Sequence, residues 1–127
     1  MIYGVGTDLI EIVRVERVLQ RFGERFAQRI LCEPELRRFR SHRQPVAYLA
    51  KRFAAKEAFS KALGTGIHAP ANWHGVWVVN LKSGKPVLEF SPALKMLLQK
   101  KKILGSHLSI SDERAIACAT VILECEG

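Results

Sequence analysis

Apolar and polar positions follow two different periods along the chain, and the change between them predicts its elements. Residues 2–12 are rich in strand-forming side chains and predict a β-strand. From Val13 onward apolar residues recur at helical spacing, with Gly23 as a candidate break. A further helix is predicted to begin near Pro34, because a proline flanked by glutamates favours a first helical turn.

The longest helix is predicted from Pro45 to about Leu63, where the stretch Gly64-Thr65-Gly66 ends it. The second half of the chain is richer in strand patterns, with turn residues between them. Its predicted strands are residues 76–81, 86–90, 106–111 and 115–123. Because helices come early and strands late, the sequence predicts an α+β fold with an antiparallel sheet, in a single domain of residues 1–127.

The composition adds a strong positive charge to this pattern. Lysine and arginine outnumber aspartate and glutamate by 20 to 12, which gives a formal net charge of +8. Part of the excess lies on a short basic helix predicted from Ser91 to near Lys102, and part on a helix face with Arg14, Arg17 and Arg21. This balance favours an anionic partner, which could be nucleic acid, a membrane surface, a phosphorylated ligand or an acidic protein.

The cysteines and the hydropathy of the chain indicate in which cellular compartment we expect the protein. Cys32, Cys118 and Cys125 have no paired or CxxC spacing, so we expect free thiols in a reducing compartment and no zinc site. Met1 is not followed by a charged and then apolar leader, and no apolar stretch is long enough to cross a bilayer. We therefore expect a cytoplasmic protein without a membrane segment.

Two carboxylates fall where the pattern calls for apolar side chains. Asp8 has the same strand parity as Ile10 and Ile12, so it needs a cation or a donor, unless the strand ends early and Asp8 caps the next turn. Glu57 continues the apolar stripe of the long helix. From the pattern alone, an i, i+4 ion pair with Lys61 is the simplest interpretation of Glu57.

A third polar pattern occurs in the first of the two final strands. His107, Ser109 and Ser111 alternate with Leu108 and Ile110, so the three polar side chains share one face of the strand. The default interpretation is a solvated sheet face, and a ligand-binding wall is the alternative. A nucleophilic Ser/His pair is not supported, because same-face neighbours on one strand lack the usual geometry and no elbow motif is present.

Three segments together resemble the 4′-phosphopantetheinyl transferase superfamily, in its short holo-acyl-carrier-protein synthase type. Residues 4–12 are similar to its G-x-D-h-h-E-h opening, residues 51–67 to its W/F-x-x-K-E-x-x-x-K signature, and residues 107–111 to its third block. The blocks occur in the family order and span essentially the whole chain. The resemblance implies an antiparallel sheet wrapped around a long central helix with additional helices. Many members follow the third block with histidine, where this chain has Asp112, so we assign Asp112 no catalytic role.

The resemblance implies an enzyme that moves 4′-phosphopantetheine from coenzyme A to a serine of apo acyl carrier protein. The other product would be adenosine 3′,5′-bisphosphate, and the reaction would support fatty acid biosynthesis. The implied catalytic residues are Asp8, Glu57 and Lys61, with Asp8 and Glu57 holding Mg²⁺ and Lys61 neutralising a phosphate oxygen. The serine proton would pass to Glu57 or to a metal-bound water, and both acceptors stay open at this stage.

The resemblance also implies contacts with coenzyme A and with protein partners. The expected coenzyme contacts are Lys61, Gly64, Thr65, Gly66, His107 and Ser109. The face formed by Arg14, Arg17 and Arg21 would bind the acidic acyl carrier protein. A homotrimer is implied, with the coenzyme site shared between neighbouring subunits. We expect the small residues of the strand at 115–120 to allow close packing between those subunits.

Two other classes of function are compatible with the composition. A small nucleic-acid-binding domain would use the basic helix and Trp73 and Trp77, but neither tryptophan lies in an RNP-type motif. Its affinity for oligonucleotides would collapse with salt. A phosphate-ligand binding module would bind coenzyme A without turnover. The three motifs favour the transferase, and we expect nucleic acid not to be a partner.

Overall fold

The helices and strands follow one another in the order that the sequence predicts. The computed structural model describes residues 1–126, and Gly127, the last residue of the domain predicted over 1–127, lies outside the described residues. The elements are β1 (Ile2–Glu11), α1 (Ile12–Phe22), α2 (Glu24–Ile30), α3 (Glu33–Ser41), α4 (Pro45–Leu63), β2 (Val76–Asn80), β3 (Pro86–Phe90), α5 (Pro92–Lys100), β4 (Ile103–Asp112) and β5 (Ile116–Cys125). Within the described part of the chain, no helix is both long and apolar enough to cross a bilayer.

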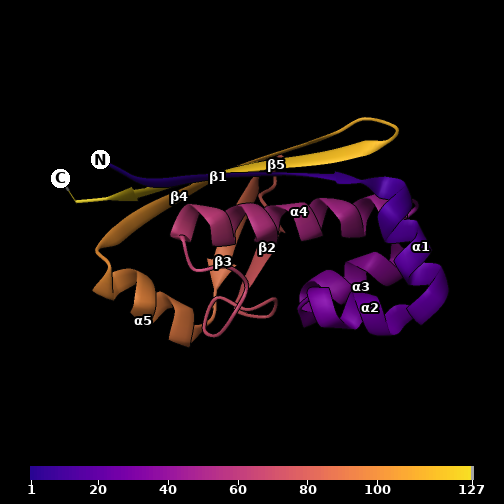
Figure 1. The fold of residues 1–127 in the computed structure, drawn as a ribbon, viewed down its shortest axis with the longest axis horizontal. Coiled ribbons are helices and arrows are strands. Elements are labelled where there is room, and N and C mark those ends of the chain that lie inside the picture. Colours follow the sequence, from indigo (N-terminus) through magenta and orange to yellow (C-terminus); the bar gives the residue numbers. More distant parts are fainter. Residues whose placement is uncertain (127) are drawn as a thin grey trace.

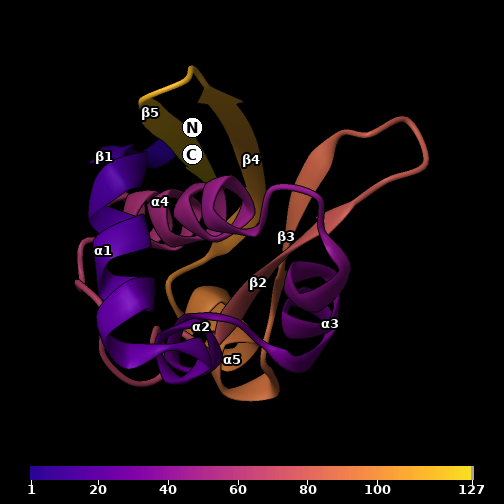
Figure 2. The same ribbon diagram turned by 90° about the vertical axis from the view of Figure 1, so that its right-hand side faces the viewer.

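The strands form two antiparallel sheets around the long helix. One sheet has the order β1-β5-β4, and the other is the β2-β3 hairpin. Helix α4 lies along one face of the three-stranded sheet, with α1, α2 and α3 near one end and α5 near the other (Figure 1). Seen along α4, the three-stranded sheet and the hairpin lie on two different sides of the helix (Figure 2). This arrangement confirms the α+β fold with strands wrapped around a central helix.

Helix α4 is buried over most of its surface. Of its nineteen residues, twelve are buried, and many of these are alanines that let neighbouring elements approach closely. Pro45 stands in its first turn, and the helix ends at Gly64, whose φ of 87° lies in the left-handed region that favours glycine. The predicted start and end of the helix are therefore confirmed.

Two glycines bring β1 against α4. A methyl group added at Gly4 would overlap the carbonyl oxygen of Ala62, and one added at Gly6 would overlap that of Ala58. Any side chain at these positions would push the strand and the helix apart. Asp8 follows on the same face of β1, so the glycines set how closely its carboxylate approaches α4.

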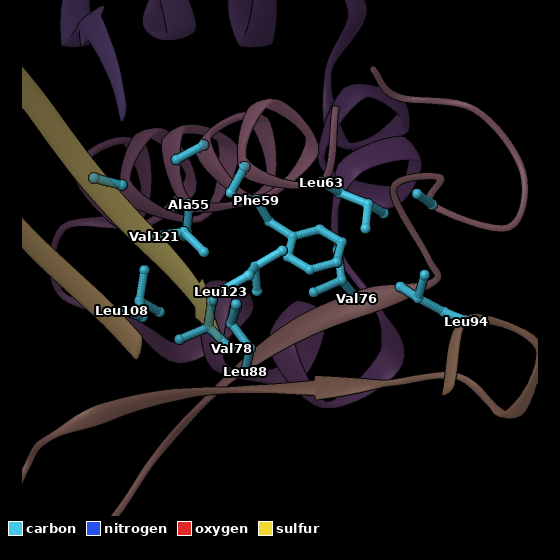
Figure 3. Close-up of a cluster of buried hydrophobic side chains, with 14 of the residues drawn as sticks. Ala55, Phe59, Leu63, Val76, Val78, Leu88, Leu94, Leu108, Val121 and Leu123 are labelled. Atoms are coloured by element: carbon cyan, nitrogen blue, oxygen red, sulfur yellow. The ribbon is translucent and has the colours of Figure 1, made fainter. Parts of the chain in front are cut away.

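The main core lies between the three-stranded sheet, α4 and the hairpin. Phe59 of α4 stands at its centre between Leu123 of β5 and Val76 of β2 (Figure 3). All three side chains are fully buried, and burial of a large apolar side chain contributes about 1.5–3 kcal/mol. A second cluster joins the other end of α4 to α1, α2 and α3. Because α4 contributes to both clusters, its position is held along its whole length.

Some predicted boundaries and one packing expectation are corrected. Gly23 does break the first helical stretch, into α1 and α2. Strands β4 and β5 are longer than predicted, because their pairing continues through a register shift as far as Ile103 and Cys125. Ala117 and Ala119, expected to be available for packing between subunits, are instead buried on the face of β5 that meets α4.

Candidate active site

Asp8 of β1 and Glu57 and Lys61 of α4 lie together where the strand packs on the helix. The Nζ atom of Lys61 donates hydrogen bonds to Asp8 Oδ1 and to the carbonyl oxygen of Thr7, both at 3.0 Å. The negative charge of Asp8 also raises the pKa of Glu57. The structure therefore brings together the three side chains to which the resemblance gave a catalytic role.

The side chain of Asp8 points inward from the middle of β1. The strand continues to Glu11, which occupies the N-cap position of α1, so the alternative that Asp8 caps an early turn is wrong. Asp8 pairs across the sheet with the buried Ala119, and its own side chain is only 15% exposed. The ammonium of Lys61 supplies the cation that a half-buried carboxylate requires.

The carboxylate of Glu57 has no comparable partner. Within residues 1–126, none of the side-chain hydrogen bonds or ion pairs uses its oxygens, so the predicted i, i+4 ion pair with Lys61 is wrong. The ammonium of Lys61 turns to Asp8 instead. Burial is the main cause that raises the pKa of Glu57, the charge of Asp8 raises it further, and Lys61 acts against both. The Lys61 ammonium therefore neutralises Asp8 and leaves the carboxylate of Glu57 without a direct cationic partner among the residues that the structure describes.

This pair of carboxylates fits Mg²⁺. A Mg²⁺ ion is bound by one or two protein carboxylates and completes its shell with water and phosphate oxygens. In the described residues, no group of three or more His, Cys, Asp or Glu side chains could hold a metal. A divalent cation between Asp8 and Glu57 would also offset the repulsion that raises the pKa of Glu57.

The segment after α4 opens the site on one side. The side chain of Lys61 is 52% exposed, and one turn later the chain enters the stretch Gly64-Thr65-Gly66. Gly64 and Gly66 both have positive φ, and a methyl group added at either would meet no atom within 4 Å. The backbone of this loop is therefore free for the approach of a ligand. Thr65 donates its hydroxyl proton to the carbonyl oxygen of Gly66.

His107 and Ser109 lie on the other face of the three-stranded sheet. Both are exposed, whereas Leu108 between them is buried, so the predicted alternation is confirmed. Ser109 pairs with Thr120 of β5, which pairs with Thr7 of β1, and this row faces away from α4. The ring of His107 pairs with Glu124. A single chain therefore does not bring His107 and Ser109 to the carboxylates.

The sequence interpretation missed Lys56 and Glu35, which form a fully buried ion pair. The distance from Lys56 Nζ to Glu35 Oε1 is 2.7 Å, and the two side chains are 0% and 1% exposed. Lys56 stands next to Glu57 inside the central motif but was given no role. The sequence did contain one indication of its role, because Lys56 is a charged residue on a helix that is apolar over most of its surface.

Trp73 and Trp77 both have partners within the chain. The ring of Trp73 packs against Phe53 with 5.0 Å between centroids, and Trp77 Nε1 donates to Glu89 Oε1 at 3.1 Å. The ring of Trp73 is therefore occupied by its contact with Phe53, whereas the Trp77 hydrogen bond uses only the edge of its ring.

Known proteins resemble the chain over nearly its whole length. The model of the 4′-phosphopantetheinyl transferase superfamily matches residues 4–120. The holo-[acyl-carrier-protein] synthase of Nitrosospira multiformis is 51% identical over 124 residues, which cover 98% of this chain and 99% of that protein. The crystal structure of the Neisseria meningitidis synthase superposes with a TM-score of 0.95 at 44% identity, over 98% of this chain and 99% of that one. The Bacillus anthracis synthase, solved in complex with CoA (3′,5′-ADP), gives a TM-score of 0.83 at 38% identity, over 99% of each chain. This chain belongs to the 4′-phosphopantetheinyl transferase superfamily, as the resemblance of its motifs indicated.

Proposed function

We propose that the chain forms one transferase domain over residues 1–127 and moves 4′-phosphopantetheine from coenzyme A to a serine of apo acyl carrier protein. The observation that carries the proposal is the convergence of Asp8, Glu57 and Lys61 beside an open glycine loop. Relatives of matching length bear the name of this activity, and one was solved with CoA. The enzyme acts in the cytoplasm, consistent with its free cysteines, and supports fatty acid biosynthesis.

The reaction is a phosphoryl transfer. The oxygen of the carrier serine bonds to the phosphorus that carries pantetheine, the bond from that phosphorus to the ADP oxygen breaks, and the serine loses its proton. In such reactions positioning and charge neutralisation provide most of the acceleration. Asp8 and Glu57 would hold Mg²⁺, which when bound supplies positive charge to the diphosphate oxygens.

Lys61 and Glu57 have roles that follow from their surroundings. Lys61 must leave Asp8 to reach a phosphate oxygen, and its side chain, which is 52% exposed, has room to turn away. The serine proton would pass to Glu57 or to a metal-bound water. Burial and Asp8 raise the pKa of Glu57 in the metal-free chain, and a bound cation would lower it again. The loop Gly64-Thr65-Gly66 would receive the coenzyme.

The reaction itself is tested by intact-protein mass spectrometry. Apo acyl carrier protein is incubated with the full chain, coenzyme A and Mg²⁺, and a gain of one phosphopantetheine mass is expected, together with release of adenosine 3′,5′-bisphosphate. EDTA should abolish the gain. A folded protein that binds coenzyme A but produces no gain would instead be the binding module without catalysis.

A homotrimer with coenzyme sites shared between neighbouring subunits is part of the proposal. The face of the three-stranded sheet that points away from α4 is uncovered (Figure 1). It bears exposed apolar side chains. Val5 is 56% exposed and Leu9 is 68% exposed, which is a large apolar surface for a sheet face left in water. His107 and Ser109 lie on this same face, so in the proposed trimer they would lie where a neighbouring subunit packs and would contact its coenzyme.

Thr120→Lys is expected to convert the trimer to monomers, because it puts a charge in the centre of the uncovered face without disturbing the core. Sedimentation velocity measures the change, and transfer activity should fall with it. Gln99→Lys on the exposed surface of α5 is the matched control and should leave the trimer intact. A wild-type protein that sediments as a monomer would contradict the shared site.

Arg14, Arg17 and Arg21 of α1 form the proposed binding face for acyl carrier protein. All three are exposed, at the end of the molecule opposite α5 (Figure 1). The neighbouring Phe22 is 52% exposed and adds apolar contact area to the charged face. Because Gly23 ends α1, Arg25 belongs to α2 and does not continue this row.

Reversing the three charges, as R14E/R17E/R21E, is expected to reduce kcat/KM for acyl carrier protein by about 100-fold, since complementary charge accelerates encounter by 10- to 1,000-fold. The KM for coenzyme A should stay unchanged, and the salt dependence of the rate should weaken. The matched control reverses three exposed lysines at the far end, as K95E/K100E/K102E. Equal losses in both triple variants would mean that net charge alone matters.

A further inference from the structure

Lys56 is a charged residue with no access to water. Its Nζ atom donates to the carbonyl oxygen of Ile30 at 2.7 Å, to Glu35 Oε1 at 2.7 Å and to the carbonyl oxygen of Trp73 at 2.8 Å. An ammonium group has three protons, so these acceptors use all of them. The lysine is therefore fixed in direction as well as paired in charge.

Both carboxylate oxygens of Glu35 also accept hydrogen bonds. Besides Lys56, its Oε1 atom accepts the backbone N–H of Cys32 at 2.9 Å, and its Oε2 atom accepts the backbone N–H of Val78 at 3.0 Å. Both oxygens thus bind donors whose positions are set by the backbone of α3 and β2. The ion pair is the centre of a network that ties α4 to the end of α2, the start of α3, the loop before β2, and β2 itself.

The rotation of α4 is also set by its packing on β1, where Gly4 and Gly6 approach Ala62 and Ala58, and by Phe59 in the core. These contacts lie on the sides of the helix that face the strands of the main core, and the ion pair lies on the side that faces α3 and the start of β2. A buried ion pair also adds little net stability compared with apolar side chains of similar volume. The network adds directional hydrogen bonds, which fix the rotation of the helix more narrowly than apolar contacts alone.

That rotation decides where the next residue points. Consecutive residues of an α-helix are about 100° apart around its axis. Lys56 is held toward α3 and β2, so Glu57 is directed toward β1, where the charge of Asp8 acts on it. A small rotation of α4 would separate the two carboxylates.

We propose that Lys56 is a positioning residue for the transfer reaction. Through Glu35 it fixes the rotation of α4 at which Glu57 faces Asp8, and through the carbonyl oxygen of Trp73 it holds the loop that starts at Gly64. The inference rests on the proposed role of Asp8 and Glu57 as metal ligands. Its effect should therefore be visible in metal binding as well as in turnover.

The test uses the variants Lys56→Met and Lys56→Met/Glu35→Gln in the full chain. The single variant leaves a buried charge without its partner, whereas the double variant removes both charges and should fold, which circular dichroism and thermal melting check. Mn²⁺ binding followed by electron paramagnetic resonance is expected to weaken about 10-fold in the double variant, the lower end for a lost supporting contact behind a metal ligand. For the same reason kcat should fall about 10- to 100-fold, while the KM for coenzyme A changes little.

Lys95→Met/Glu33→Gln is the matched control, since it removes the same two charges from exposed positions. A folded double variant at Lys56 and Glu35 with wild-type Mn²⁺ affinity and kcat would overturn the proposal, and the network would then only stabilise the fold. Asp8→Asn and Glu57→Gln are measured alongside. If these also bind Mn²⁺ like the wild type, the metal site itself is wrong, and the positioning role is overturned with it.

Discussion

Glu57→Gln is expected to reduce the rate of phosphopantetheine transfer by about 1,000-fold, within the range for loss of a general base. The substitution keeps the shape of the side chain but removes a proposed metal ligand and one of the two proposed acceptors of the serine proton. Asp8→Asn should cause a comparable loss through the metal alone. The rate is followed by intact-protein mass spectrometry with saturating coenzyme A and Mg²⁺.

The matched control is Glu33→Gln, which removes an exposed carboxylate at the start of α3. It should retain wild-type activity. A Glu57→Gln variant that keeps more than a tenth of the wild-type rate would contradict the assignment of both roles to Glu57. The same preparations give the stability of the variants.

The inactive Glu57→Gln variant should be more stable than the wild type at neutral pH in the absence of divalent metal. Burial and Asp8 raise the pKa of Glu57 in the folded protein above its unfolded value. Between these two pKa values the folded state binds more protons, so wild-type stability falls as the pH rises through that window. Above it, the charged carboxylate destabilises the fold, and glutamine removes this effect.

Thermal melting at pH 8 and again at a pH below the unfolded pKa of glutamate measures the difference. The variant should melt at a higher temperature at pH 8, and the gap should close in acid. A variant that melts lower than the wild type at pH 8 would mean that the Glu57 carboxylate has a stabilising partner in the metal-free protein. Loss of activity together with a gain in stability is typical of a functional residue whose buried charge destabilises the fold.

The sequence predicts those features of this fold that depend on nearby residues. Pro45 and Gly64 mark the ends of α4, because proline suits a first turn and glycine suits the left-handed residue that ends a helix. Gly23 separates α1 from α2 for a similar reason. The length of β4 and β5 escaped prediction, because it depends on pairing across a register shift near Gly105, where the alternation of the single strand is interrupted.

In the candidate site, too, the sequence predicts what depends on nearby residues and not what depends on tertiary packing. Asp8 and Glu57 stand out in the sequence because each breaks an apolar pattern, and the structure brings them together. The alternation around Ser109 predicts that one face of its strand is polar. Whether that face lies toward α4 or away from it depends on where the helix packs, which the sequence of the strand alone does not show. Glu35 could not be matched to Lys56, because the two lie 21 residues apart and their contact is made by tertiary packing alone.

Lys61→Met is expected to have two opposite effects. Transfer should fall about 100- to 1,000-fold, because the variant removes a positive charge aimed at the reacting phosphate. Without coenzyme A, however, Mn²⁺ should bind more tightly than to the wild type. In the structure the ammonium of Lys61 donates a hydrogen bond to Asp8 Oδ1 at 3.0 Å, so it competes with a metal for the same carboxylate.

The gain in Mn²⁺ affinity should be about 1.4- to 5-fold, which corresponds to the 0.2–1 kcal/mol that an exposed ion pair contributes. Electron paramagnetic resonance titration measures it, with Lys95→Met on α5 as the matched control that changes neither quantity. Weaker Mn²⁺ binding in Lys61→Met would show that the lysine assists the metal site and does not compete for it. The expected results would instead mean that Lys61 neutralises Asp8 in the metal-free enzyme. When Mg²⁺ takes over that role, the lysine is released and can contact the phosphate.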